Sequence, residues 1–416
     1  TGEVFRGIDV NSLEVEKNLM SSVVAVFGLG KYQKSGILEL KKRNFITIGF
    51  DENNSPYSKK SVNKFFNVSF NNIKKIQKIC IENKVKYLFA FSTDAPLNLI
   101  SKLNENLKLQ GYKKKDVNLV SDKIKLRKFL KKKMKISQPK FNYFQNFDKI
   151  SKKKFDKFKK PIVCKPNIGS GSKGVFFAND YLNFLKLFKE NKSFYKKKKI
   201  LIENFIQGTE YAIEGWIYNN KFILGCLSKK KRSNLPYLLD VSLIINYKNS
   251  NIISQVNKFF SKFIKKSNMN NLPVHFEFLI RNNRIVPIDF AIRGAGFGVY
   301  SEILSKIMQQ STNKILVNLI MNLDIEFNKP NDKTFFLRFL FSNKKGIFKG
   351  ITNISKLKKL SSFRELQFYK KKNSKVSILK NGHDRIGHII LESSSKNLYK
   401  DVVKSDNLIK TKIENE

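Results

Sequence analysis

Cysteine is scarce in this chain of 416 residues. Its three cysteines, Cys80, Cys164 and Cys226, lie far apart and in apolar surroundings. That distribution excludes a disulfide framework and a cysteine-rich metal site. Because unpaired cysteines are typical of a reducing compartment, we expect the protein to be cytoplasmic.

Long apolar runs are absent as well. No stretch approaches the roughly 18 consecutive apolar residues that a membrane-spanning helix requires, and no basic region followed by an apolar core opens the sequence. We therefore expect no membrane partner and no secretory signal. Residues 1–20 carry little pattern, and we expect a leader segment there that is disordered or not native.

Acidic residues are few, since 33 Asp and Glu stand against 81 Lys and Arg and give a formal net charge of +48. Such an excess attracts phosphate backbones, so nucleic-acid binding is one alternative function. The lysines, however, recur along the whole chain in runs such as 131–133, 152–154 and 196–199, without zinc-finger spacing or interleaved aromatic residues. We expect these runs to be solvated and expect no specific nucleic-acid partner.

Apolar residues are plentiful: they make up 41% of the chain and include 37 Phe and 14 Tyr, enough for a substantial interior. The length predicts two to four domains. The first, 21–118, alternates apolar and amphipathic segments, which favours a Rossmann-like parallel sheet. The expected strands span 21–30, 45–51 and 85–94, and the expected helices span 35–43 and 73–83.

A glycine-rich turn after the first expected strand raises the alternative of a dinucleotide site. Gly28 and Gly30 match part of that pattern, as does Asp51 at the end of the second strand. Gln33, however, stands where the third glycine should be. We expect a scaffold or a substrate pocket at these strand ends.

A second glycine-rich segment, Gly169 to Gly174, lies within "IVCKPNIGSGSKGVFFA". A strand-like run follows it at once, whereas the glycines of a Rossmann fingerprint open a helix. A Walker A loop is excluded because Val175 occupies the position of its lysine, and a protein kinase is excluded because Lys165 precedes the loop. A β-hairpin remains, either a flexible surface hairpin or one whose backbone amides cover phosphate oxygens while Lys165 reaches them.

Two carboxylates, Glu277 and Asp289, stand on adjacent strand-like runs. A loop of three residues, 282–284, would place them opposite each other, and the two-residue period of a strand puts His275 and Arg293 on the same face. Facing carboxylates repel unless a cation lies between them, and such ligands suit Mg²⁺ that is shared with nucleotide phosphates. Large apolar neighbours argue against the alternative of exposed cross-strand charges.

The other segments alternate between helix and strand patterns. The expected elements are a basic helix at 122–133 capped by Ser121, a helix at 180–191, a strand at 199–206, a hairpin that turns at Asn219 and Asn220, a helix at 252–266, an apolar helix at 301–323, and short strands and turns over 330–416.

Taken in order, the motifs "SDK" (121–123), "VCKPNIGSGSKGV", "LIENFIQGTEY" and "HFEF" with "VPIDFAIRGAG" resemble those of the ATP-grasp superfamily of carboxylate–amine ligases, of the amino-acid and purine types. The resemblance covers residues 21–325. It implies a fold of α/β and α+β class: a Rossmann-like pre-ATP-grasp domain (21–118), an ATP-grasp domain (119–325) and a small, β-rich C-terminal α+β domain (326–416).

The resemblance also implies ATP as the nucleotide, with Mg²⁺ or alternatively Mn²⁺. The implied ATP contacts are Lys123 and Lys165 on the phosphates, Gly169, Ser170, Gly171, Ser172 and Gly174 over them, Glu203, Phe205 and Ile206 at adenine, and Glu210 at ribose. Glu277 and Asp289 would hold the metal. Arg293, which would stabilise an acyl phosphate, and His275 are the candidate catalytic residues.

The implied reaction converts a small-molecule carboxylate into an acyl phosphate and joins it to an amine, with release of ADP and phosphate; a homodimer is compatible with it. The chain departs from the family where glutamate, any residue and asparagine are usual, since it has Asp289, Phe290 and Ala291. The alternatives are a carbamoyl-phosphate-synthase-like or purine-pathway carboxylase that uses bicarbonate, and a degenerate nucleotide- or nucleic-acid-binding protein.

Overall fold

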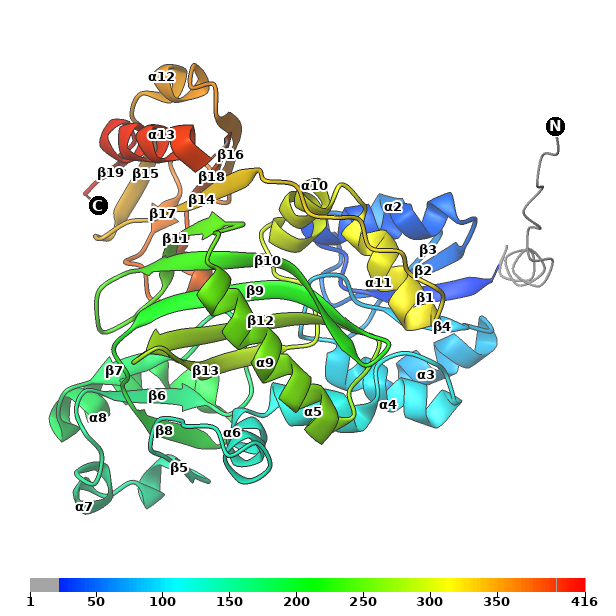
Figure 1. Ribbon diagram of the computed structural model, residues 1–416, viewed down its shortest axis with the longest axis horizontal. Coiled ribbons are helices and arrows are strands. Elements are labelled where there is room, and N and C mark those ends of the chain that lie inside the picture. The colour runs from blue at the N-terminus through cyan, green and yellow to red at the C-terminus, as the bar shows by residue number, and fades with distance from the viewer. Residues whose placement is uncertain (1–21, 394, 416) are drawn as a thin grey trace.

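The computed structural model describes residues 22–393 and 395–415, so the predicted leader lies outside the described residues (Figure 1). The first sheet has the order β3-β2-β1-β4, and all its pairs are parallel, which confirms the predicted Rossmann-like arrangement. Its elements are β1 (Val23–Phe27), β2 (Ile46–Asp51), β3 (Lys64–Asn67), β4 (Tyr87–Phe89), α2 (Lys34–Lys42), α3 (Ile73–Glu82), α4 (Leu97–Leu107) and α5 (Lys114–Ser121).

Two local details of this region differ from the prediction. The strand expected at 85–94 is only the three residues of β4, because the chain bends away after Phe89. The basic helix α6 (Lys123–Lys132) is capped by Asp122 and not by Ser121, which ends α5. The Asp122 carboxylate accepts hydrogen bonds from the backbone of Ile124 and Lys125, as an N-cap residue does.

A separate antiparallel sheet carries the glycine-rich segment, with the order β5-β8-β6-β7. Its elements are β5 (Phe141–Phe144), β6 (Ile162–Pro166), β7 (Phe176–Ala178), β8 (Ile200–Asn204), α7 (Lys152–Phe155) and α8 (Tyr181–Asn191). Strands β6 and β7 pair directly, so the predicted glycine-rich hairpin is confirmed. The rings of Phe155, Phe176 and Phe184 pack together beneath it as the centre of a separate hydrophobic core.

The largest sheet of the described chain has eight strands in the order β13-β12-β9-β10-β11-β14-β18-β16. The strands are β9 (Thr209–Tyr218), β10 (Lys221–Arg232), β11 (Asp240–Ile245), β12 (Leu272–Arg281), β13 (Arg284–Ala291), β14 (Thr334–Leu340), β16 (Phe363–Phe368) and β18 (Gly387–Ser393). Helix α9 (Ser250–Ser267) lies across one face (Figure 1).

The two faces of β12 differ because strand residues alternate in direction. Phe276 and Phe278 point to α9, and the ring of Phe276 stacks on that of Phe259 with centroids 4.6 Å apart. Burying a phenylalanine contributes about 1.5–3 kcal/mol, so this packing fixes the rotation of the strand. The alternate residues, His275 and Glu277, are thereby held on the opposite, polar face.

The hairpin between β12 and β13 has the predicted register, but for a different reason. Glu277 lies opposite Asp289, as expected. The turn has two residues, Asn282 and Asn283, both with positive φ, and Arg281 pairs with Arg284. A bulge after Glu277 adds the residue that the shorter turn removes.

The chain beyond β13 is more broken than predicted. Instead of one apolar helix at 301–323, the chain forms a π-helical turn η5 (Val299–Leu304), α10 (Ser305–Met308) and α11 (Thr312–Met321). The break falls at Gln309, which adopts the left-handed conformation that ends a helix. Helix α11 then packs against α2, which belongs to the parallel-sheet region (Figure 1).

The C-terminal segment has both strands and helices, as the predicted α+β class implies, although the local pattern indicated only short strands and turns. It adds the helices α12 (Ile354–Lys358) and α13 (Ser395–Leu408), and a small sheet in the order β17-β15-β19 made of β15 (Gly346–Ile351), β17 (Lys375–Val376) and β19 (Thr411–Glu414). Strands β14, β18 and β16 continue the eight-stranded sheet across the predicted domain boundary at 325/326. None of the helices in the described ranges is long and apolar enough to span a bilayer.

Candidate active site

The central site residues lie on the polar face of the large sheet. Strand pairing places His275 beside Glu214 of β9, and Glu277 opposite Asp289 of β13. Arg293 follows β13 by two residues. Of the four residues predicted to share one face, His275, Glu277 and Asp289 do so, whereas Arg293 lies beyond the end of β13.

Glu277 is the acidic centre of an ion-pair network. Its carboxylate lies 2.8 Å from the ammonium of Lys230 and 3.2 Å from Nε2 of His275. Lys230 is buried and also bonds Glu210 at 2.8 Å and Asp240 at 3.2 Å. Burial raises the pKa of Glu277, but the charge of Lys230 and the hydrogen bond from His275 outweigh it and hold that pKa well below its usual value. Glu277 is thus a carboxylate at neutral pH.

His275 lies between two carboxylates, because Nδ1 bonds Glu214 and Nε2 faces Glu277. Burial lowers its pKa, but the charge of Glu214 and the hydrogen bonds to both carboxylates raise it to about 9. His275 is therefore an imidazolium at neutral pH, a cation that orients Glu277. Glu214 also accepts a 2.9 Å hydrogen bond from the backbone of Ala295, which anchors the "RGAG" loop.

We expect His275 to make the stability of the protein depend on alkaline pH. A raised folded-state pKa gives stabilisation that is complete below the unfolded value of 6.5 and is lost as pH rises through about 9. The difference between these two pKa values corresponds to up to about 3 kcal/mol in the free energy of unfolding. The free energy of unfolding, measured with denaturant from pH 6 to 10, should fall in the wild type and fall less in His275→Gln. An equal dependence on pH in the two proteins would contradict this prediction.

Asp289 connects the face to the glycine-rich loop through Lys123. The ammonium of Lys123 lies 3.0 Å from the Asp289 carboxylate and 3.0 Å from the carbonyl oxygen of Gly169. Lys123 is the first residue of α6, so the helix start, the loop and the sheet meet at one ammonium group. The loop carries positive φ at Gly171, Ser172 and Gly174, and a Cβ placed on Gly171 would meet no atom within 4 Å.

Lys165 and Glu203 form a buried ion pair in the smaller sheet. Their charged atoms are 2.6 Å apart, and Arg127 of α6 bonds the same carboxylate at 2.5 Å. Arg127 also donates to the carbonyl oxygen of Pro287, at 2.7 Å, and so connects this sheet to β13. Burial raises the pKa of Glu203, but the charges of Arg127 and Lys165 lower it to about 2.

Arg293 is held by Asp94, which lies between β4 and α4. Its guanidinium makes two bonds to the carboxylate of Asp94, at 2.7 and 3.1 Å, and donates to the carbonyl oxygen of Gly294 at 2.9 Å. Burial raises the pKa of Asp94, but the charge of Arg293 outweighs it and lowers that pKa. The paired carboxylate fixes the arginine beside the start of the "RGAG" loop.

The comparisons with known proteins agree with this geometry. Residues 158–301 match the family model of the ATP-grasp domain. This chain therefore contains an ATP-grasp domain. A comparison of the ATP-grasp chain with curated proteins gives no match.

Solved structures similar to this ATP-grasp chain extend over nearly its whole length. An L-amino acid ligase from Bacillus licheniformis is 16% identical, with 95% of this chain and 99% of that chain covered and a TM-score of 0.80. The phosphoribosylglycinamide synthetase from Anaerococcus prevotii is 18% identical, with 95% and 100% covered and a TM-score of 0.69. The N5-carboxyaminoimidazole ribonucleotide synthetase from Thermotoga maritima is 16% identical, with 94% and 100% covered and a TM-score of 0.69. At these identities the likeness shows the fold.

ATP-grasp proteins use ATP with Mg²⁺, and a similar solved carboxylase domain is described in complex with ADP and its magnesium salt. Within the described part of this chain, no three His, Cys, Asp or Glu side chains are close enough together to hold a metal ion by themselves. Glu277 and Asp289 supply two facing carboxylates, and Ala291 adds no ligand. This donor set fits a hard divalent cation whose other ligands are phosphate oxygens and water.

Phe205 and Glu210, two more of the predicted nucleotide contacts, already have partners within the chain. The backbone amide of Phe205 donates to Pro161, at 3.1 Å, and its ring packs on Phe177. Glu210 bonds Lys230 and Arg232, and so belongs to the network around Glu277. The roles at adenine for Glu203, Phe205 and Ile206, and at ribose for Glu210, stay predictions.

Sequence reasoning missed several members of this site: Asp94, Arg127, Glu214, Lys230, Arg232 and Asp240. Lys230 and Arg232 stand in the run "SKKKR", which resembles the solvated lysine runs elsewhere in the chain. The two-residue period of β10 could have distinguished Lys230 and Arg232 from the solvated lysines, because it puts both on the polar face while Lys231 is exposed. No local signal connects Asp94 to Arg293, which is 199 residues away.

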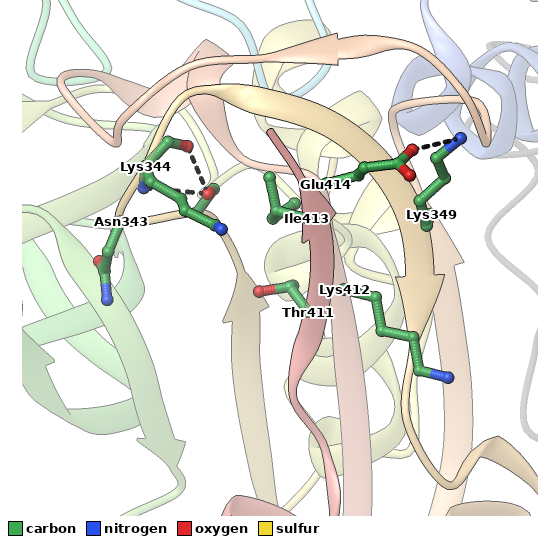
Figure 2. Close-up of a pocket in the computed structure, with 8 residues that line it drawn as sticks. Asn343, Lys344, Lys349, Thr411, Lys412, Ile413 and Glu414 are labelled. Carbon is green, nitrogen blue, oxygen red and sulfur yellow. Dashed lines mark hydrogen bonds and ion pairs between the residues drawn. The ribbon is translucent and has the colours of Figure 1, made fainter. Parts of the chain in front are cut away.

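A surface depression of about 630 Å³ lies elsewhere, beside the small C-terminal sheet (Figure 2). Lys344, Lys349 and Lys412 line it, and Lys349 pairs with Glu414 at 2.8 Å. None of its lining residues belongs to the network around Glu277. The candidate active site is therefore placed at that network and not in the depression.

Proposed function

We propose that this chain is an ATP-dependent ligase that activates a carboxylate as an acyl phosphate and joins it to an amine. The observation that carries the proposal is the pair of facing carboxylates, Glu277 and Asp289, with Lys123 and the glycine-rich loop beside Asp289. Phosphoryl transfer needs positioning and charge neutralisation more than a nucleophilic side chain, and this cluster supplies cations, metal ligands and backbone amides.

The proposed reaction has two steps. A carboxylate oxygen of the first substrate attacks the γ-phosphorus of ATP, the bond to the β-phosphate oxygen breaks, and ADP leaves. The neutral amine of the second substrate then attacks the acyl carbon, phosphate leaves with the electron pair of the C–O bond, and the nitrogen loses a proton. A bound Mg²⁺ supplies neutralisation of phosphate charge.

We assign each site residue a role from its charge and its position. Glu277 and Asp289 would hold the metal, Lys123 and Lys165 would bind phosphate oxygens, and the loop at 169–174 would cover them. Arg293, held by Asp94, would stabilise the negative charge that develops on the acyl oxygen as the amine attacks. His275 is the imidazolium that keeps Glu277 in place.

Similar structures support an amino-acid or related carboxylate as the first substrate. The L-amino acid ligase has the higher TM-score, 0.80 against 0.69 for the purine-pathway synthetase from Thermotoga maritima. Bicarbonate is the second candidate, because a similar carboxylase domain is described in complex with ADP and bicarbonate.

One experiment separates the two candidates. ADP formation is measured with mixtures of amino acids and amines in bicarbonate-depleted buffer, and separately with bicarbonate alone. We expect ADP only when a carboxylate and an amine are both present. ADP formation that needs bicarbonate and no other carboxylate would establish the second candidate instead.

We expect ATP with Mg²⁺ to stabilise the fold, because it binds the assembled loop, α6 and sheet and not the unfolded chain. At 100 times its dissociation constant the gain is about 2.7 kcal/mol. Thermal unfolding with and without MgATP measures it, with NADH as the control that should have no effect. A shift with NADH and none with ATP would contradict the ligase and favour a dinucleotide site.

A further inference from the structure

One buried cation of the protein lacks a carboxylate partner. Four Lys or Arg side chains of residues 22–393 and 395–415 are buried, and Arg127, Lys165 and Lys230 each form an ion pair with a glutamate. The fourth, Arg385, is 6% exposed and makes no ion pair within these residues. It directly follows the short helix η6 (Gly382–Asp384) of the C-terminal segment. A buried charge without a counter-ion is unfavourable for folding, so its retention points to an anion from outside the chain.

The guanidinium of Arg385 also has more donors than acceptors. Nη2 donates to the backbone carbonyl oxygen of Asp240 at 2.9 Å, whereas Nε is buried and has no hydrogen-bond partner in the described chain. The central carbon, Cζ, lies 3.5 Å from the centre of the Phe339 ring and 4.9 Å from that of Phe297. These rings attract the positive charge but offer no atom that accepts a conventional hydrogen bond. The ring contacts therefore leave Nε unused.

The charges around Arg385 favour an added anion. Burial lowers the pKa of Arg385, and the charge of Arg232 lowers it further, because two guanidinium groups repel each other. The charges of Asp240 and Glu277 raise that pKa but do not offset these effects. An anion bound at Arg385 would reduce both the cost of burial and the repulsion.

Arg232 supplies a second, independent indication of an acceptor that the protein itself does not provide. Its guanidinium lies 3.3 Å from the Asp240 carboxylate, and its Nε is buried without a hydrogen-bond partner in the part of the chain that is described. Two guanidinium groups that contact Asp240 thus each keep an unused donor. The Asp240 carboxylate also lies 3.2 Å from Lys230, which connects this region to the network around Glu277.

Arg385 lies beside the glycine-rich loop. The backbone amide of Gly382 donates to the carbonyl oxygen of Gly171, at 3.3 Å. A Cβ placed on Gly382 would lie 3.9 Å from Nη1 of Arg385, so this nitrogen is close to the same contact. The loop at 169–174 is the segment that we expect to cover the phosphates of ATP. The C-terminal segment therefore brings Arg385 near the proposed reaction centre.

The ring of Phe297 connects Arg385 to Arg293. Phe297 follows the "RGAG" loop, which starts at Arg293, and its ring contacts the Arg385 guanidinium. A Cβ placed on Gly296 would meet no atom within 4 Å, so there is room beside this loop. The two arginines thus lie at opposite ends of one short segment.

A carboxylate that the reaction does not consume is the anion that best fits Arg385. The carboxylate that attacks ATP becomes an acyl phosphate and then an amide, so it loses its charge. A carboxylate on the amine substrate stays ionised from binding to release. One guanidinium neutralises the single charge of a carboxylate and matches its two oxygens, whereas a phosphate group carries a larger charge.

We propose that Arg385 binds the carboxylate of the amine substrate, which makes that substrate an amino acid and the product a peptide-like amide. This inference rests on the proposed ligase function. The unused donors of Arg385 bond the carboxylate, and the rings of Phe297 and Phe339 hold the guanidinium in place. The amino group of the same substrate extends past Gly296 toward the acyl phosphate at Arg293.

The first test compares the binding of L-amino acids with that of their α-carboxamides, which lack only the carboxylate. Isothermal titration calorimetry uses the full chain with Mg²⁺ and ADP. We expect the wild type to bind at least one amino acid about tenfold or more tightly than its carboxamide, the effect of a charged hydrogen bond. Arg385→Gln should reduce that preference to about threefold or less. O-phosphoethanolamine and ethanolamine form the corresponding pair for a phosphorylated amine, and we expect no preference between them.

Arg364→Gln is the matched control, because it removes an exposed arginine of β16 and should keep the preference. Thermal unfolding shows whether each variant folds. Arg385→Lys keeps the charge but not the planar fork, so it should show an intermediate preference and tests the site even where the glutamine variant does not fold. Equal affinities or no binding in every wild-type pair, a preference for the phosphorylated amine alone, or an undiminished preference in both Arg385 variants would overturn the inference.

A second test establishes which substrate carries the carboxylate that Arg385 binds. Hydroxylamine traps an acyl phosphate as a hydroxamate, but it has no carboxylate. We expect Arg385→Gln to slow ADP formation from two amino acids at least about tenfold more than it slows hydroxamate formation. An equal loss in both assays would place the bound carboxylate on the first substrate and overturn the assignment to the amine. A wild type that forms neither ADP nor hydroxamate would contradict the ligase proposal instead, while the calorimetric preference would still report on the carboxylate site.

Discussion

Glu277→Gln should reduce ADP formation at least about a hundredfold, the largest loss that we expect from any single substitution in this chain. The amide keeps the shape of the side chain but removes the negative charge that a hard divalent cation requires. The fold should survive, because Lys230 keeps its bonds to Glu210 and Asp240 after the substitution. The measurement is ADP release as a function of Mg²⁺ concentration.

Glu392→Gln is the matched control for that experiment. Glu392 is another buried glutamate with cationic partners, Lys333 at 2.8 Å and Arg364 at 2.9 Å, and it lies on β18 outside the network around Glu277. We expect this variant to form ADP at the wild-type rate. Normal turnover in Glu277→Gln would show that the two facing carboxylates are not a metal site, and the proposed mechanism would be wrong.

Lys165→Met should lower the affinity for ATP about 10- to 150-fold, the effect of losing a charged hydrogen bond worth about 1.5–3 kcal/mol. The methionine side chain fills the space of the lysine stem. Glu203 is not left as an isolated buried charge, because Arg127 still bonds it at 2.5 Å. We therefore expect the variant to fold, and calorimetric titration with ATP measures its affinity.

The control for this prediction is Lys186→Met, which removes an exposed lysine from α8 of the same small sheet domain. It subtracts the same charge from a chain of net charge +48 without touching the loop. Equal ATP affinity in Lys165→Met, Lys186→Met and the wild type would show that the glycine-rich segment is a plain surface hairpin.

Local patterns in the sequence were enough to predict the main features of the fold. Alternating strand and helix segments indicated the parallel sheet, and the aromatic run after Gly174 correctly distinguished a hairpin from a helix-opening turn. The pairing of Glu277 with Asp289 was also right, although two errors compensated: the turn is one residue shorter than predicted, and a bulge restores the register. Bulges leave no clear mark in a single sequence.

The missed residues have a common physical origin. Lys230 and Arg127 are buried cations whose partners lie on other strands, so only the tertiary structure distinguishes them from solvated lysines and arginines. The break at Gln309 likewise follows from helix capping by a residue without special propensity. Because the chain has 81 Lys and Arg, the few basic residues of the candidate site cannot be distinguished by residue type from the many others.

The continuity of the eight-stranded sheet has a consequence for the evolution and engineering of this protein. Residues 242–245 of β11 pair with 335–338 of β14, so the C-terminal segment covers what would be an open sheet edge. A chain that ended after 325 would expose the unpaired amides and carbonyls of "DVSLII", an apolar template for intermolecular strand addition. The last ninety or so residues thus act as protection against aggregation, and the sheet cannot be shortened there without replacing that cover.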